Sequence, residues 1–427
     1  MARAYTPRDA HTLMNALVEQ ATGAQTITVV DTSTFVSAGE LVMSTGLENV
    51  YNALSILVGR TYAAVRPYDA RLQLINAINS GVYTNRFRKI SYYSKPAQPS
   101  GWFNTQLFTN LKDGFTAGQN PDAQGNAQST KSQYEINSGV PLEVNFGGSS
   151  TWQESLTIFE NQLKVAFRSE SEFMAFWTGL VTQKDNDIEM EKEAFNRMTL
   201  LNHMAARVDF ANQNLIPGGA VNLTAAFNAR FGTAYTSAQL RTTYLTEFLA
   251  FFVSMIKTHS MQMRQNSLNY HWTPTLTRDG VTYNRLNRHT PARNQRLLLY
   301  TPLFVEAEAQ VFPEVFHENY LELKNYEGVM FWQAEDATFT NNPKLDVTPA
   351  VTDPATGLQT AGNRIQLEYV VGMLYDEDAL MVDYQLETTN TSPLEARKGY
   401  RTQWYTFAKN AISDLTENGI VFYMADS

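Results

Sequence analysis

Acidic residues are the first candidates for chemistry in this sequence. Asp376, Glu377 and Asp378 stand in a row between two strand-like segments. Three neighbouring carboxylates can bind a divalent cation, yet such a group between strands is more often a solvated turn. Glu306 and Glu308 could act as an acid and base pair, but residues two apart on a helix do not face each other. We therefore predict neither a metal site nor a catalytic pair.

Other site signals are missing from the chain. It contains no phosphate-binding loop, dinucleotide fingerprint, nucleophile elbow or H-E-x-x-H zinc motif. Its six histidines are scattered singly, and a lone histidine is more often packed or exposed than a ligand. The absence of cysteine excludes disulfides, thiolate metal sites and a cysteine nucleophile, and fits a reducing compartment. The sequence thus predicts a protein that is not an enzyme and has no cofactor.

Composition and charge limit the remaining classes. A chain of 427 residues can bury a large core and usually divides into two or three regions. Its net charge of -9 argues against a dedicated nucleic-acid binder, which would neutralise phosphates with lysine and arginine. The polar N-terminus predicts no secretion signal. The longest apolar run, Phe248 to Ile256, is far shorter than the ~20 residues that cross a bilayer, so we expect no membrane contact.

One long helix organises the expected fold. Ser169 and Glu172 have the spacing of a capping box, and Phe173, Phe176 and Trp177 begin an apolar stripe at helical spacing. A polar block around Asp185 interrupts the stripe, which then resumes and continues to position 208. If continuous, about 40 residues at ~1.5 Å each span roughly 60 Å. Two helices with a kink near Asp185 are the alternative.

A polar segment precedes this helix. Ser94 to Gln133 is dominated by Gly, Asn, Gln, Ser, Thr, Ala and Pro, and includes a few large apolar side chains such as Trp102 and Phe103. Strand-like sequence flanks it at Ile90 to Tyr93 and at Val140 to Phe146. This pattern predicts a long hairpin that reaches away from the body. Because an isolated two-stranded hairpin is marginal in water, it needs a surface to lie on.

Complementary charge suggests where copies of the chain could meet. Arg86, Arg88 and Lys89 stand at the root of the predicted hairpin, and acidic residues stand in the middle of the long helix. Each group alone is more often a solvated face, but together they favour a contact between different subunits. The residues predicted to contact another subunit are Arg86, Arg88, Lys89, Trp102, Phe103, Glu189, Glu191 and Glu193.

The other expected elements follow from periodicity and turn residues. Arg8 to Thr22 reads as a helix closed by Gly23, and a second helix starts at Thr236 or Ser237. A buried strand is expected at Arg296 to Tyr300. Further strands are expected at Arg364 to Leu374, Leu380 to Leu386, Tyr400 to Ile412 and Ile420 to Met424. Asn418-Gly419 is a hairpin-turn signal between the last two.

The order of these elements resembles the major capsid protein of tailed double-stranded DNA bacteriophages. The segment Met373 to Leu380, the strand Arg401 to Ile412 and the final Ile420 to Phe422 are similar to the closing part of that family. The segment Trp152 to Phe167, before the long helix, is similar to the short-tailed branch. The resemblance implies an α+β fold of the Hong Kong 97 type.

The resemblance also implies a domain order. An N-terminal arm covers 1–60, and the first part of a peripheral domain covers 61–90. An extended loop at 91–150 lies across a neighbouring subunit. The peripheral domain continues with the spine helix at 151–213, an axial domain follows at 214–363, and closing strands at 364–427 return to the peripheral domain.

As function, the resemblance implies a structural virion protein that self-assembles into hexamers and pentamers of an icosahedral shell around double-stranded DNA. A separate scaffolding protein and a portal protein are expected as partners, with assembly in the host cytoplasm. A nanocompartment shell protein of the same fold is the alternative, and a soluble hydrolase that uses carboxylates is less favoured.

Overall fold

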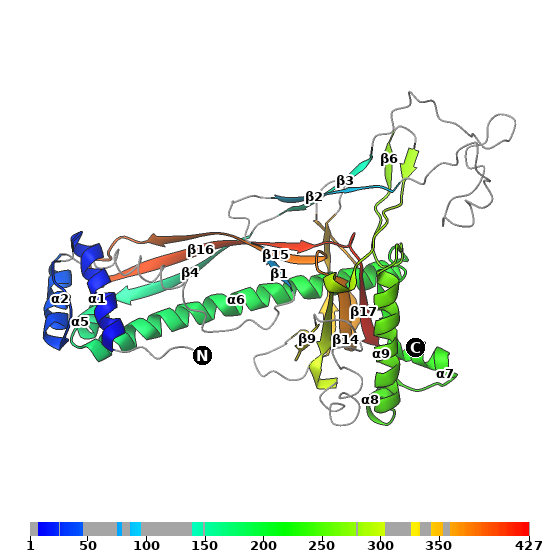
Figure 1. Cartoon of the computed structure of the whole chain (residues 1–427), viewed down its shortest axis with the longest axis horizontal. Helices are drawn as coiled ribbons and strands as arrows, with labels where there is room; N and C mark the ends of the chain where they lie inside the picture. Colours follow the sequence, from blue (N-terminus) through cyan, green and yellow to red (C-terminus); the bar gives the residue numbers. More distant parts are fainter. Residues whose placement is uncertain are drawn as a thin grey trace.

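The computed structural model describes residues 7–24, 26–45, 75–78, 86–94, 139–147, 150–278, 281–303, 326–333, 343–352 and 359–426. A long helix lies along one sheet and ends against a second sheet, which further helices cover (Figure 1). The predicted α+β class is confirmed.

The long helix, α6, is continuous from Glu170 to Asn212, a span of 43 residues. The hydroxyl of Ser169 accepts a hydrogen bond from the Glu172 amide at 3.2 Å, so the serine half of the predicted capping box is confirmed. The described Glu172 side chain does not return a bond to the Ser169 amide, so the other half is wrong. At ~1.5 Å per residue the helix is roughly 65 Å long. The alternative of two kinked helices is therefore wrong, and the helix extends past position 208.

Three shorter helices pack around the first turns of α6 (Figure 1). They are α1 (Pro7–Thr22), α2 (Thr32–Ser44) and α5 (Glu160–Ala166). The rings of Phe35 and Phe167 each lie 5.6 Å from that of Phe173 on α6. The predicted helix closed by Gly23 is confirmed, and Gly23 has a φ of +75°. Aromatic packing thus holds the N-terminal helices on the long helix.

The first sheet lies along α6. Its strand order is β1-β15-β16-β4, with β15, β16 and β4 antiparallel and β1 parallel to β15. The strands are β1 (Asn76–Ile78), β15 (Leu380–Thr391), β16 (Tyr400–Ser413) and β4 (Ser150–Phe159). Along the first part of β16, residues with odd numbers are buried and their neighbours are more exposed, so one face of the sheet packs on the helix.

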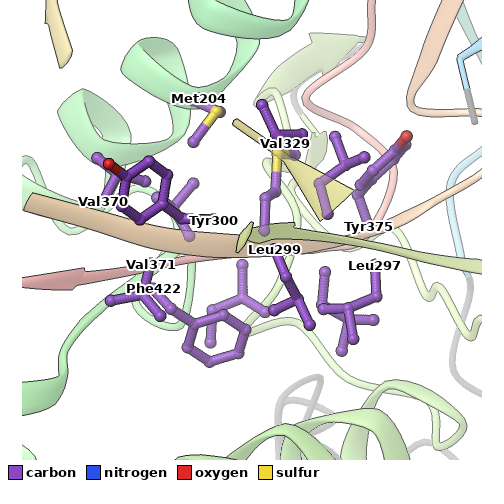
Figure 2. Packing of buried hydrophobic residues seen from close by; sticks show 14 of the residues in the cluster. Met204, Leu297, Leu299, Tyr300, Val329, Val370, Val371, Tyr375 and Phe422 are labelled. Carbon is purple, nitrogen blue, oxygen red and sulfur yellow. The ribbon is translucent and has the colours of Figure 1, made fainter. Parts of the chain in front are cut away.

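The second sheet forms most of the apolar core. Its order is β5-β17-β14-β8-β9, with strands β5 (Ala220–Asn222), β17 (Gly419–Met424), β14 (Tyr369–Asp376), β8 (Gln295–Tyr300) and β9 (Tyr326–Val329). Figure 2 shows side chains from these strands packed together, with Met204 of α6 among them. The helices beside this sheet are α7 (Leu223–Phe231), α8 (Ser237–Thr242) and α9 (Leu245–Met263). Phe252 of α9 meets Phe422 of β17 edge-on at 5.4 Å.

The expected strands at the end of the chain are present, but they divide between the two sheets. Strands β15 and β16 belong to the sheet along α6, whereas β14 and β17 pair within the core sheet beside β8. The sequence prediction placed all of 364–427 in one domain, whereas the strands of this range belong to two different sheets.

The predicted hairpin turn at Asn418-Gly419 is wrong. Strand β16 ends at Ser413 in one sheet and β17 begins at Gly419 in the other, so residues 414–418 connect the sheets. Gly419 is not among the glycines with positive φ that a primed turn would require. It is needed for another reason, because a Cβ there would lie 2.6 Å from Cζ of Arg207. A close approach, rather than a turn, explains this glycine.

The predicted strands that flank the polar segment do pair. β2 (Arg86–Tyr92) and β3 (Pro141–Gly147) form an antiparallel ribbon, in register from Arg86 with Gly147 to Tyr92 with Pro141. Residues 95–138, which include Trp102 and Phe103, lie outside the described residues. The base of the ribbon packs on the same subunit through buried residues, namely Val140, Leu142, Val144 and Phe146 against Leu286, Met381 and Ile412.

Short ribbons and one 3-10 turn complete the described fold. β6 (Leu276–Arg278) pairs with β7 (Val281–Tyr283), and the turn η1 covers Ala292–Asn294. The other two ribbons are β10 (Leu345–Val347) with β13 (Ile365–Leu367) and β11 (Ala350–Thr352) with β12 (Gln359–Ala361).

Candidate functional site: charged junction and uncharged sheet face

The connector between the two sheets is the centre of a charged junction. Lys89 of β2 places Nζ 2.5 Å from Oδ2 of Asp414 and 2.5 Å from Oε1 of Glu417. Burial alone would lower the pKa of Lys89, but the two carboxylates outweigh it and the pKa is raised. Lys89 therefore stays charged and ties the base of the hairpin to the connector.

Arg288 holds the connector from another side. Its Nη2 lies 3.2 Å from Oε1 of Glu417, and its Nε donates to the carbonyl of Thr416 at 3.1 Å. The same guanidinium donates to Oγ of Ser91 on β2 at 2.7 Å. Burial raises the pKa of Glu417, although the nearby Lys89 and Arg288 oppose this. The hairpin base and the segment after β7 thus share one acidic anchor.

Arg207 is the third cation at the junction and is completely buried in α6. Its guanidinium donates to the carbonyl oxygens of Tyr270, Glu417 and Gly419 at 2.9, 2.6 and 3.0 Å. Nε donates to Nε2 of His203 at 2.8 Å, and burial lowers the pKa of Arg207 to about 10. One helix side chain thereby fixes the connector and the start of β17 to the helix.

Neutral histidines support this arrangement. Because Nε2 of His203 accepts from Arg207, Nδ1 carries the proton and donates to Oγ of Ser413 at 2.9 Å. Burial first, and Arg207 second, keep the pKa of His203 well below its usual value. His271 lies between Asn418 and the carbonyl of Leu286, and burial lowers its pKa to about 4.

The predicted basic contact residues differ in their surroundings. Arg88 points outward on β2 with an exposed side chain, 3.7 Å from Glu143 on the paired strand. Arg86 lies on β2, and its side chain is outside the described residues. Lys89 is already bound within the subunit. Arg88 is the described member of this group that remains most accessible to another subunit.

The predicted acidic residues on α6 each have a partner within the subunit. Glu189 lies 3.5 Å from Lys192, and Glu193 lies 3.0 Å from Arg197. Glu191 lies 3.4 Å from Nζ of Lys409 on β16. Contact of these residues with another subunit stays a prediction, and it would have to share or replace these pairs.

The acidic residues considered first for metal or acid-base chemistry do not form such a site where they are described. Asp376 is buried, accepts hydrogen bonds from Thr290 Oγ1 and the Asp378 amide, and has a pKa raised mainly by burial. Glu377 pairs with Arg296 at 2.5 Å. The expectation of a solvated turn is therefore wrong for Asp376. Glu306 and Glu308 lie outside the described residues.

Metal clusters and membrane-spanning helices are both missing from the described ranges. No three His, Cys, Asp or Glu side chains gather there as a metal site would require. No helix in the same ranges is both long and apolar enough to span a bilayer.

The face of the first sheet that points away from α6 is uncharged at positions 400, 402, 404 and 406 of β16 and at the residues paired with them, whereas the buried Asp383 of β15 pairs with Asn410 further along the strand. Trp404 and Phe159 are 41% and 43% exposed there, and the rings of Phe159 and Tyr400 lie 5.6 Å apart. Thr157 and Thr402 hydrogen-bond across strands at 3.0 Å. The paired positions on this face are Gln153, Ser155, Thr157, Phe159, Thr388, Asn390, Tyr400, Thr402, Trp404 and Thr406. We call these ten residues the uncharged sheet face.

Sequence reasoning missed the junction and this face. Arg207 stands alone among apolar residues of the long helix, four positions after His203, and that spacing on one helix side was the available signal. The acidic anchors Asp414 and Glu417 gave no local signal, because their partners are distant in the chain. Alternating Thr and aromatic residues in Tyr400 to Thr406 could have indicated the uncharged face.

The sequence model of the family described as Phi29-like phage major capsid protein matches residues 151–423. A search of curated proteins gives no match. Among solved structures, the chain is similar to one in the capsid structure of Staphylococcus phage Andhra, with 12% identity, 84% of this chain and 88% of that chain covered, and a TM-score of 0.49. It is also similar to a chain in a structure of native bacteriophage P68, with 11% identity, 82% and 83% covered, and a TM-score of 0.47. A chain of the bacteriophage PhiM1 mature capsid shares 11% identity, with 84% and 88% covered and a TM-score of 0.42.

Proposed function

Because the chain belongs to the Phi29-like phage major capsid protein family, we propose that its copies form hexamers and pentamers of an icosahedral shell around double-stranded DNA. It is a structural protein of the virion capsid that assembles with identical subunits. The observation that carries this is the family match over 151–423, which includes the long helix, most of both sheets and the junction residues other than those of β2. A separate scaffolding protein, a portal protein and assembly in the host cytoplasm belong to the same proposal.

The surface that we assign to contact between subunits is the uncharged sheet face. It carries exposed aromatic rings, and its ten residues have no charge to repel a neighbour. Its proposed occupant is the segment 94–133 of a second copy. That segment is rich in Asn, Gln, Ser, Thr and Gly, includes Trp102 and Phe103, and carries few charges, namely Lys95, Lys112, Asp113, Asp122 and Lys131.

Two features support this pairing. The hairpin base is anchored to its own subunit by Lys89 and by the buried side of β3, so the point from which the segment departs is fixed. Polar, uncharged side chains on both partners avoid the cost of burying an unpaired charge. The exposed side of the hairpin adds Arg88, Ile90 and Tyr92 to the surface available to a neighbour.

The decisive experiment is expression of the full-length chain together with its candidate scaffolding protein, followed by electron microscopy. The proposal expects closed particles of uniform size that form only when the scaffolding protein is present. A chain that stays monomeric with the scaffolding protein, or that forms only irregular aggregates, would contradict it.

A variant pair tests the contact surface. Thr402→Lys places a charge at the centre of the uncharged sheet face. The native Thr402 hydroxyl hydrogen-bonds there to the hydroxyl of Thr157 on the paired strand. Assembly should fall at least tenfold while the subunit still folds, because burial of an unpaired ammonium is costly. Thr258→Lys is the matched control, since Thr258 is exposed on α9. Equal assembly of both variants would count against this surface.

A further inference from the structure

The contact between the first sheet and α6 contains an unusual number of charged groups. Lys409 of β16 has a fully buried side chain, and Lys184 of α6 is 4% exposed. Their ammonium groups lie over aromatic rings, with Lys184 Nζ 4.0 Å from the centre of Tyr405 and Lys409 Nζ 4.7 Å from that of Trp152. This layer therefore depends on a close balance of charge.

Glu154 of β4 is the carboxyl group at the centre of this layer. Tyr405 lies opposite it on β16, and the ammonium group of Lys184 lies over the ring of Tyr405. The carboxyl group of Asp187 on α6 faces that of Glu154, and Oε2 of Glu154 is buried without a hydrogen-bond partner in the described part of the chain. Two carboxylates that face each other away from water repel unless one of them carries a proton.

The charged groups around Glu154 also favour its protonated form. From α6 come Lys184, Asp187, Glu189, Glu191 and Lys192, and from β16 comes Lys409. The pairs Glu189 with Lys192 and Glu191 with Lys409 are close, which leaves Lys184 to balance Asp187. Among these six described groups the charges balance, so ionisation of Glu154 adds one negative charge that none of them offsets.

We propose that Glu154 is protonated where it faces Asp187 across the contact between β4 and α6, and that loss of this proton on raising the pH loosens β4 from the helix. The carboxyl groups lie between two packed elements of the same subunit, so the proton stabilises their contact directly. The device belongs to the subunit itself and does not depend on what the shell encloses.

The direction of the pH effect follows from the linkage between proton binding and stability. Burial, then Asp187 and Glu191, raises the pKa of Glu154 to about 7 in the folded form, against 4.5 for an unperturbed glutamic acid. The stabilisation is fully present below 4.5 and is lost as the pH rises through about 7. Between pH 6 and 8, opening of β4 should therefore increase by up to about tenfold, less to the extent that solvent screens this partly exposed group.

Hydrogen exchange of the full-length chain at pH 6 and pH 8, corrected for intrinsic exchange rates, measures this opening in residues 150–159. In the parent protein, exchange should be several-fold faster at pH 8. Glu154→Gln should remove most of that difference, because a neutral amide replaces the protonated carboxyl group. Glu172→Gln, at an exposed position in the first turn of the same helix, should leave the difference unchanged.

Asp187→Asn is the second variant, and it remains informative if Glu154→Gln does not fold. It removes the other carboxylate, so Glu154 can ionise without excess charge and the pH difference should again shrink. The infrared difference spectrum between the parent protein and Glu154→Gln at pH 6 should show a protonated carboxyl band that the variant has lost. An unchanged pH difference in both variants, or equal intensity of that band in the parent and in Glu154→Gln, would overturn the inference.

Discussion

The central cation of the junction gives the strongest test of the fold. Arg207 donates hydrogen bonds to three buried carbonyl oxygens from two segments, 270 and 417–419, and to His203 within its own helix. Arg207→Met keeps much of the length of the side chain and removes these donors. The helix would then lose its polar attachment to the connector between the sheets.

The expected loss in the free energy of unfolding combines the cost to the three carbonyl groups with the gain from removing a buried charge. A buried polar group without its partner costs about 1–3 kcal/mol, so three carbonyls give an upper range of roughly 3–9 kcal/mol. Removing a buried guanidinium returns part of its desolvation cost, which is several kcal/mol per ion. We expect a net loss of about 3 kcal/mol in the free energy of unfolding.

Urea denaturation of the unassembled full-length chain measures this loss, and hydrogen exchange locates it. Protection of residues 414–419 should fall more than protection of the N-terminal helices. Arg230→Met is the control, because Arg230 is exposed at the end of α7 and should change stability by less than about 0.5 kcal/mol. A loss below about 1 kcal/mol for Arg207→Met would refute the role assigned to this residue.

Three further changes test other parts of the structure. Ser169→Ala removes the N-cap of α6 and should cost about 1 kcal/mol by urea denaturation, whereas no loss would mean that the cap is redundant. Gly419→Ala places a Cβ 2.6 Å from Cζ of Arg207 and should cost about 2 kcal/mol, with a crystal structure showing a displaced guanidinium; a neutral effect would contradict that close approach. The lowered pKa of His271, about 4 against 6.5, adds stability above pH 6.5 that is lost as the pH falls towards 4, and His271→Gln should flatten the pH profile of the melting temperature in that window.

Local patterns predicted much of the architecture. Ser169 with Glu172, and the apolar spacing that follows, located the start of α6 within a residue. Alternation at Leu380 to Tyr384 and the flanks of the polar segment predicted strands that the structure contains. These signals work because caps, periodicity and strand alternation are set by residues close in sequence.

Tertiary contacts explain what local patterns did not predict. Asn418-Gly419 has turn chemistry, but Gly419 is required by Arg207, which is 212 positions away. Lys89 looked like part of a basic surface patch, but Asp414 and Glu417, 325 and 328 positions later, neutralise it. Such partners are fixed by the packing of whole elements, so they leave no trace in a local window of sequence.

Electron cryomicroscopy of shells formed by the full-length chain tests the central claim most directly. The account predicts closed icosahedral particles in which segment 94–133 of one subunit covers the uncharged sheet face of its neighbour, around Trp404 and Phe159. Particles in which that face is open to solvent, or a chain that forms no particles with its scaffolding partner, would contradict it.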